Sequence, residues 1–166
     1  MSQHGHMGFV GVSTQNSSIM KVFPLWAEIL ELPTKTLRGY DVPLDATEQD
    51  YRDLVTQLRS DPSHFGALVT THKMKLYDAA APLFDEIDPF GVACREISSI
   101  SKPNGKLVGR AKDPITVGLA LDDFLPETYF AERGAEVLIL GAGGSGTALS
   151  WALAHRTTDA PAKVTV

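Results

Sequence analysis

The sequence is poor in cysteine, in basic residues and in long apolar runs, and each shortage excludes a class of protein. Its 166 residues include one cysteine, Cys94, so an internal disulfide framework is excluded and a reducing cytoplasm is the expected compartment. No apolar run approaches the roughly 18 residues of a membrane span, so we expect no membrane partner. The 15 Lys and Arg against 20 Asp and Glu leave a net charge of −5. That balance argues against a nucleic-acid partner, which would favour a basic surface.

The first residues, "MSQHGHM", also lack a pattern. They do not show the charged and then apolar order of a signal peptide. His4 and His6 could bind a metal ion, but a solvated tail is the better interpretation of two isolated histidines. We therefore predict no metal site.

A glycine-rich segment near the end of the chain carries the clearest chemistry. Gly141, Gly143 and Gly146 match G-x-G-x-x-G, after the apolar run Val137 to Leu140 and before the helix-forming "TALSWALAH". In such a loop the glycines allow a tight turn, close approach of a pyrophosphate, and close packing of the helix. The free N–H groups of the helix start suit a phosphate. The residues expected to bind the dinucleotide are Gly141, Ala142, Gly143, Gly144, Ser145 and Gly146.

Two expectations follow from the position of this loop. The residue that reads the ribose should stand about 20 residues beyond the motif, past Val166. The choice between NAD and NADP therefore stays open, and we expect the chain to be a piece of a longer protein. The run Val137 to Leu140 reads as a strand buried on both faces, but a nucleotide domain cut after its second strand should leave apolar surface there uncovered.

The first hundred residues alternate between short apolar strands and amphipathic helices. Helical spacing covers "SSIMKVFPLWAEILEL", where Pro24 allows a kink or a later helix start, and "ATEQDYRDLVTQLRS"; "KLYDAAAPLFDEI" reads as a helix interrupted or bent near Pro82. The segments "MGFVGV", "TLRGYDVPL" and "FGALVTT" read as strands, and "REISSISKPNGKLVGRA" as a hairpin. The pattern predicts an α/β substrate-binding domain over residues 8–113, a connecting helix over 114–134, and the first βαβ portion of a Rossmann-type domain over 135–166.

Five segments, in this order, resemble the shikimate dehydrogenase family from Gly8 to Val166. They are "STQNSSIM", "GALVTTHK", "ISSIS", "GKLVGRAKDP" and "GAGGSG". The resemblance implies an NADP-dependent dehydrogenase, with NAD as the alternative, that acts on shikimate or a related cyclic hydroxy acid in aromatic amino acid biosynthesis. The oligomeric state stays open, with a homodimer as one possibility.

The resemblance also implies which residues act. Lys73 matches the family lysine if one gap is placed in "VTTHK", and Asp113 matches the family aspartate; together they would carry the proton chemistry. A carbonyl that gains a hydride becomes an alkoxide, which needs a cation or a proton donor nearby. Without the family match, Lys73 reads as a surface residue and Asp113 as the cap of a helix beginning at Pro114. The implied substrate-binding residues are Ser17, Thr70, Thr71, Ser98 and Lys112.

Several positions depart from the family pattern. Ile19 replaces a second hydroxyl near the substrate carboxylate, and Lys112 replaces a neutral threonine. Ser98 stands in place of one asparagine, and Leu68, or Ala67 with the other gap placement, in place of another. Because a site built around particular hydroxyls discriminates strongly, the substrate could instead be quinate, an amino-shikimate or another hydroxy acid. The remaining alternative is a ligand-sensing regulator without catalysis.

Overall fold

The computed structural model describes residues 5–166 and divides the chain into two compact units. The first unit ends at Arg110 and the second comprises Ala111–Val166. Their elements alternate between helices and strands, so the predicted α/β class is confirmed. His6 lies in the first strand, whereas His4 lies outside the described residues.

The first unit is built on one six-stranded sheet of order β2-β1-β3-β5-β6-β4. Strands β2, β1 and β3 are mutually parallel, β5 runs antiparallel to β3 and β6, and β4 is parallel to β6. The strands are β1 (His6–Gly11), β2 (Leu37–Asp41), β3 (His64–Val69), β4 (Glu86–Ile87), β5 (Ser99–Ser101) and β6 (Val108–Arg110). The carboxyl ends of β1, β2, β3 and β6 therefore lie at one edge of the sheet.

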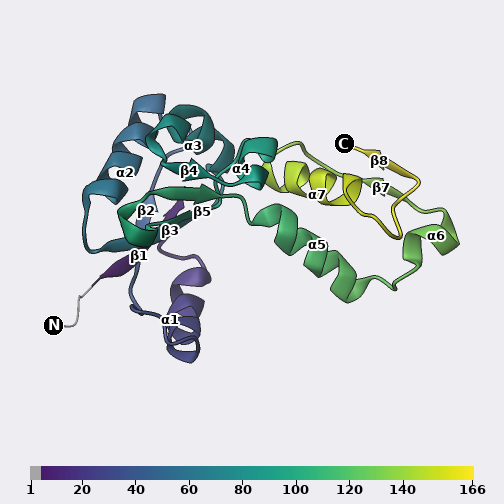
Figure 1. Ribbon diagram of the computed structural model, residues 1–166, viewed down its shortest axis with the longest axis horizontal. Coiled ribbons are helices and arrows are strands. Elements are labelled where there is room, and N and C mark those ends of the chain that lie inside the picture. Colours follow the sequence, from purple (N-terminus) through teal and green to yellow (C-terminus); the bar gives the residue numbers. More distant parts are fainter. Residues whose placement is uncertain (1–4) are drawn as a thin grey trace. The chain divides into compact units, whose positions relative to one another are not determined.

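Helices cover this sheet, with α2 and α3 above the strands and α1 below them in Figure 1. They are α1 (Ile19–Ile29), α2 (Glu48–Ser60), α3 (Lys73–Ala80) and α4 (Pro89–Cys94), with short 3-10 turns at Ala81–Leu83 and Pro103–Gly105. Helix α2 buries Tyr51, Leu54, Val55 and Leu58, whose spacing places them on one face. These side chains share the main core with Val10 and Val69 of the sheet and Leu76 of α3.

The second unit contains two parallel strands and three helices. Its elements are α5 (Asp113–Phe124), α6 (Tyr129–Arg133), β7 (Glu136–Leu138), α7 (Gly144–Ala154) and β8 (Lys163–Thr165). Strands β7 and β8 pair in parallel on either side of α7, which is a βαβ unit, and α5 packs on α7. The division falls between Arg110 and Ala111, and residues 114–134 form most of α5 together with α6.

Most elements agree with the sequence predictions, and the differences are confined to a few segments. Helix α4 and strand β4 were not expected, and Glu86–Ile87 form β4 where the helix of "KLYDAAAPLFDEI" was predicted to continue. Pro24 lies inside one continuous helix α1. The expectation that Val137–Leu140 is buried on both faces is wrong: Ile139 is buried, whereas Leu138 and Leu140 are 68% and 89% exposed. Leu138 and Leu140 thus expose the apolar surface that was also expected there, whereas Val137 and Ile139 pack with side chains of α5, α6 and α7.

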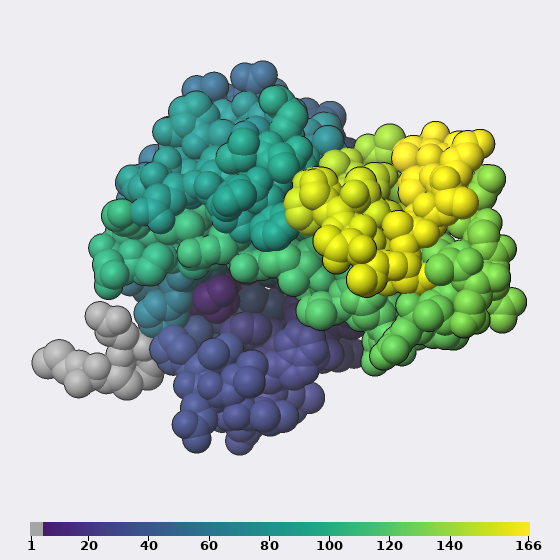
Figure 2. All heavy atoms as spheres, turned by 45° about the vertical axis from the view of Figure 1, so that its right-hand side comes forward, coloured from purple at the N-terminus to yellow at the C-terminus, as the bar shows by residue number. Residues whose placement is uncertain are grey.

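Apolar side chains are also exposed on α1. Leu25, Trp26, Ile29 and Leu30 are all more than half exposed, on the purple segment that forms a lobe at the lower edge of Figure 2. None of the helices in residues 5–166 has both the length and the apolar character required to span a bilayer.

Candidate active site

Loops from three parallel strands meet at the carboxyl edge of the first unit's sheet. The loop after β1 carries Ser17, the loop after β2 follows Asp41, and the turn after β3 carries Thr70 and Thr71. Ser98 reaches the same edge because β5 runs antiparallel to β3, and Val69 N–H donates to the Ser98 carbonyl at 2.9 Å. The structure thus brings the expected Ser17, Thr70, Thr71, Lys73 and Ser98 to one edge of one sheet.

The loop after β1 is held by a side chain from β2. The backbone N–H and the hydroxyl of Thr14 both donate to Oδ1 of Asp41, at 2.8 and 2.6 Å. The Thr14 carbonyl accepts from the N–H of Ser17 at 3.0 Å. These bonds lower the pKa of the Asp41 carboxyl, because they stabilise its ionised form. Sequence reasoning missed Thr14 and Asp41, whose partnership across 27 positions has no local signal.

The turn after β3 is tight and leads directly into α3. Thr70 N–H donates to the Val10 carbonyl at 2.9 Å, and the Thr70 carbonyl accepts from the N–H of His72. Thr71, between them, has a φ of 34°, a conformation that is uncommon for residues other than glycine. Lys73 is then the first residue of α3. The turn therefore sets where the expected catalytic lysine leaves the sheet edge.

His72 holds the start of α3 against α2. It is 1% exposed, and its Nδ1 lies 2.8 Å from the Tyr51 hydroxyl of α2. Burial lowers the pKa of His72, and a hydrogen bond to the Val42 backbone opposes that effect. The sequence offers little signal for this role, because a histidine beside a lysine reads as a polar surface pair.

Ser98 occupies a different environment from the one expected of a substrate ligand. It is 2% exposed, and its hydroxyl lies 3.4 Å from the Arg110 carbonyl. Its N–H donates to the same carbonyl at 3.0 Å. Leu68, where the family pattern has an asparagine, is 39% exposed. In place of the expected amide groups, Ser98 thus has a buried hydroxyl and Leu68 has an exposed apolar side chain.

The second unit holds the remaining expected residues. Lys112 directly precedes α5, which begins at Asp113 and not at Pro114. The glycine loop leads from β7 into α7, and Gly141 has a φ of 112°, where a side chain would be strained. A Cβ at Gly146 would overlap the Gly141 carbonyl, whereas a Cβ at Gly143 would meet no atom within 4 Å. The first and third glycines thus close the turn, and the second leaves open space beside the N-terminus of α7.

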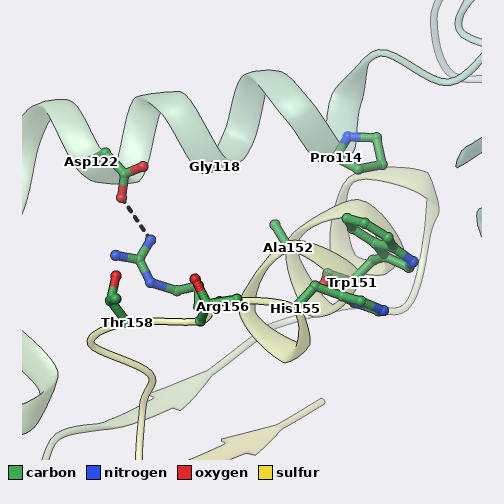
Figure 3. A pocket seen from close by; sticks show the side chains of 9 residues that line it. Pro114, Gly118, Asp122, Trp151, Ala152, His155, Arg156 and Thr158 are labelled. Atoms are coloured by element: carbon green, nitrogen blue, oxygen red, sulfur yellow. Dashed lines mark hydrogen bonds and ion pairs between the residues drawn. The ribbon is translucent and has the colours of Figure 1, made fainter.

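A separate pocket of about 330 Å³ lies between α5 and the last turn of α7 (Figure 3). Arg156 and Asp122 form an ion pair at its rim, at 2.7 Å, and the His155 ring stacks on Trp151. An 11-residue helix is about 16 Å long, so this pocket lies at the far end of α7 from the glycine loop. Within residues 5–166, no group of three His, Cys, Asp or Glu side chains could hold a metal ion.

The fold resembles that of solved shikimate dehydrogenases and of a quinate dehydrogenase. Shikimate dehydrogenase 1 from Peptoclostridium difficile superposes with a TM-score of 0.75 and 18% identity, over 96% of this chain and 53% of that protein. Quinate dehydrogenase from Corynebacterium glutamicum, in complex with NAD, gives a TM-score of 0.73 and 20% identity, over 93% and 52%.

One curated relative supports the same similarity in sequence. The shikimate dehydrogenase (NADP(+)) of Bacillus cereus strain G9842 is 31% identical over 87 residues, which are 52% of this chain and 29% of the relative. No family model matches the chain. The similarity to shikimate dehydrogenases predicted from the motifs is confirmed, and the chain spans about half or less of the length of these relatives.

Proposed function

We propose that this chain forms the substrate-binding unit, and the start of the nucleotide-binding unit, of a shikimate dehydrogenase-like oxidoreductase. The reaction is a reversible hydride transfer between NADP(H), with NAD(H) as the alternative, and a ring hydroxyl or ketone of shikimate, dehydroshikimate or a related cyclic hydroxy acid. The observation that carries the proposal is the convergence of Ser17, Thr70 and Lys73 at one sheet edge, in a chain whose fold follows shikimate dehydrogenase over 96% of its length.

The residues of the glycine loop fit a dinucleotide phosphate. Open space beside Gly143 and the positive end of the α7 dipole suit an anion. The loop residues Gly141 to Gly146 would hold the pyrophosphate, and the bound nicotinamide would donate or accept the hydride. Both dinucleotides occur among the relatives: one is described as shikimate dehydrogenase (NADP(+)), and another was solved in complex with NAD.

The proton chemistry falls to Lys73 and Asp113 in this proposal. When the substrate ketone is reduced, the alkoxide that forms takes a proton from the Lys73 ammonium, and in the reverse direction the neutral amine removes the hydroxyl proton. Asp113, the first residue of α5, is assigned to the same proton chemistry by the family resemblance, with its carboxylate accepting a hydrogen bond from the substrate hydroxyl. The tight turn at Thr71 supports the lysine assignment, because it starts α3 at the sheet edge.

The substrate carboxylate is assigned to the Ser17 loop, with Thr70, Thr71 and Lys112 as further contacts. Ile19 offers no hydroxyl, and Ser98 is buried against the Arg110 carbonyl. Each hydrogen bond missing from a charged group costs about 1.5–3 kcal/mol, or roughly a tenfold to hundredfold loss of binding. Shikimate should therefore be a poor substrate, and quinate is the second candidate because a quinate dehydrogenase shares the fold.

The test is a kinetic assay of the protein that contains this chain. Shikimate and quinate are each offered with NADP⁺ and with NAD⁺, and the reduced nicotinamide is followed by absorbance. Lys73→Ala and Asp113→Asn should each lower kcat at least about a hundredfold, the usual size of acid–base catalysis. Lys75→Ala is the matched control, because this lysine lies on the same helix and donates to the Leu44 carbonyl. No turnover of either acid would overturn the proposed function, and an effect of Lys75→Ala alone would overturn the choice of lysine.

We also propose a homodimer that buries α1. The exposed Leu25, Trp26, Ile29 and Leu30 support it, because contiguous apolar surface of this kind marks an interface.

A further inference from the structure

The loop that carries Ser17 is anchored to β2 by hydrogen bonds between Thr14 and Asp41, which have no role of their own in the proposed reaction. Thr14 is 4% exposed although it lies in a loop whose neighbours Ser13 and Gln15 are exposed. Its N–H and hydroxyl converge on one carboxylate oxygen of Asp41 at the end of β2. Its carbonyl accepts from Ser17 N–H at 3.0 Å, and the Ser17 carbonyl accepts from Met20 N–H at 3.1 Å. A continuous series of hydrogen bonds thus runs from Asp41 through Thr14 to Ser17 and the start of α1.

The neighbouring backbone is shaped to admit Thr14. A Cβ at Gly39, on β2, would overlap the Thr14 hydroxyl, so the bond to Asp41 depends on glycine at that position. The Thr14 methyl lies 3.5 Å from the position of a Cβ at Gly11, where β1 ends. On the same strand ends, Val42 N–H donates to the Gly11 carbonyl at 2.8 Å. Thr14 is therefore seated in a place that two strands leave for it.

We propose that Asp41 and Thr14 are positioning residues that set Ser17 to receive the carboxylate of the substrate. This inference rests on the proposed function, since Ser17 is assigned to the substrate there. In this proposal Asp41 acts through Thr14: its Oδ1 accepts both Thr14 donors, and the Thr14 carbonyl accepts from the Ser17 N–H. With Ile19 in place of a second hydroxyl, recognition of the carboxylate depends more heavily on how well Ser17 is held.

The bond to Asp41 should survive throughout the neutral pH range. Hydrogen bonds from Thr14 lower the pKa of Asp41 below its usual value of 3.8. The ionised carboxylate that accepts both donors is therefore present above that value and is lost only as the pH falls through the lowered pKa. An amide at position 41 would keep an acceptor oxygen without any titration.

The test compares variants that remove an acceptor or donor with variants that keep it. Asp41→Leu and Thr14→Val remove the side-chain hydrogen bond between the two residues, whereas Asp41→Asn and Thr14→Ser retain it. In the protein that contains this chain, the first pair should raise KM for the acid substrate about tenfold. They should leave kcat and KM for the dinucleotide unchanged, and the second pair should behave like the parent. An unchanged KM in Asp41→Leu, or an equal loss in Asp41→Asn, would overturn the assignment.

A second measurement does not depend on turnover. Hydrogen exchange of the Ser17 amide, followed by NMR, should be about tenfold faster in Asp41→Leu and Thr14→Val than in the parent, because the turn that protects it loosens. Amides of β1 and β3 serve as the reference for intact folding. Failure of the proposed function would leave this difference in exchange in place, whereas equal exchange in all variants would refute the positioning role itself.

Discussion

At the scale of single residues, His64 shows how burial sets a titration. It lies at the start of β3, 2% exposed, and its Nδ1 accepts from Gly66 N–H at 3.2 Å. Burial, together with the positive charges of His6 and Lys102, lowers the pKa of His64 to about 4, and Asp61 opposes them. The folded protein therefore holds His64 neutral where an unfolded chain would already protonate it.

Because the pKa of His64 is lowered in the folded state, the first unit should lose stability in acid. Stability due to neutral His64 is complete above pH 6.5 and falls as the pH drops toward 4, by about 3 kcal/mol at pH 4. His64→Gln should flatten this part of the pH dependence, which urea midpoints measured by circular dichroism between pH 7 and pH 4 would show. His155→Gln removes an exposed histidine of the second unit and is the control. The same slope in the His64 variant and the parent would contradict this account.

At the scale of elements, the first turn of α7 depends on two glycines that differ in their surroundings from a third in α5. A Cβ at Gly146 would overlap the Gly141 carbonyl, so the helix approaches the end of β7 only without a side chain there. Gly118, in the middle of α5, meets nothing within 4 Å of its Cβ position. Close packing therefore requires glycine at position 146, whereas at position 118 only helix propensity distinguishes glycine from alanine.

Alanine substitutions should separate these two cases. Gly146→Ala should displace the loop and weaken dinucleotide binding at least about tenfold, because the carbonyl it would strike belongs to the backbone. Gly118→Ala should stabilise α5 by about 0.5–1 kcal/mol and leave binding unchanged. Calorimetric titration with NADP⁺ and with NAD⁺, together with thermal unfolding, measures both effects. Tight binding in the Gly146 variant would show that the third glycine is not required.

At the scale of the whole molecule, the distribution of apolar side chains divides buried cores from bare surfaces. The first unit has a continuous core between its sheet and α2 and α3, yet Ile29 and Leu30 of α1 are 78% and 65% exposed. A bare apolar helix face in water favours association, which is the physical basis of the proposed homodimer.

Charges on that face should therefore lower the molecular mass in solution. Ile29→Glu combined with Leu30→Glu should convert a dimer to a monomer, as measured by sedimentation velocity. Leu44→Glu is the matched control, since Leu44 is 61% exposed and lies in the loop between β2 and α2, where its carbonyl accepts from Lys75 of α3. A monomeric parent protein, or an equal effect of the control, would count against the α1 interface.

The sequence by itself determined the features that depend on local patterns. The spacing of Tyr51, Leu54, Val55 and Leu58 predicts α2 and its buried face, because helix periodicity is a property of neighbouring residues. The glycine spacing at Gly141 to Gly146 predicts the turn into α7, because backbone conformation there excludes side chains. The motif order likewise predicts the family whose fold the chain shares.

Only the tertiary structure decided the features that join distant parts of the chain. The partnership of Thr14 with Asp41, and of Tyr51 with His72, joins positions 27 and 21 apart. The burial of Ser98 depends on the register of β5 between β3 and β6, and the exposure of Leu138 depends on which faces α5 and α7 cover. Such contacts arise from packing between elements. A hydrogen bond between residues far apart in the chain produces no periodic or local pattern in the sequence, so sequence patterns do not predict it.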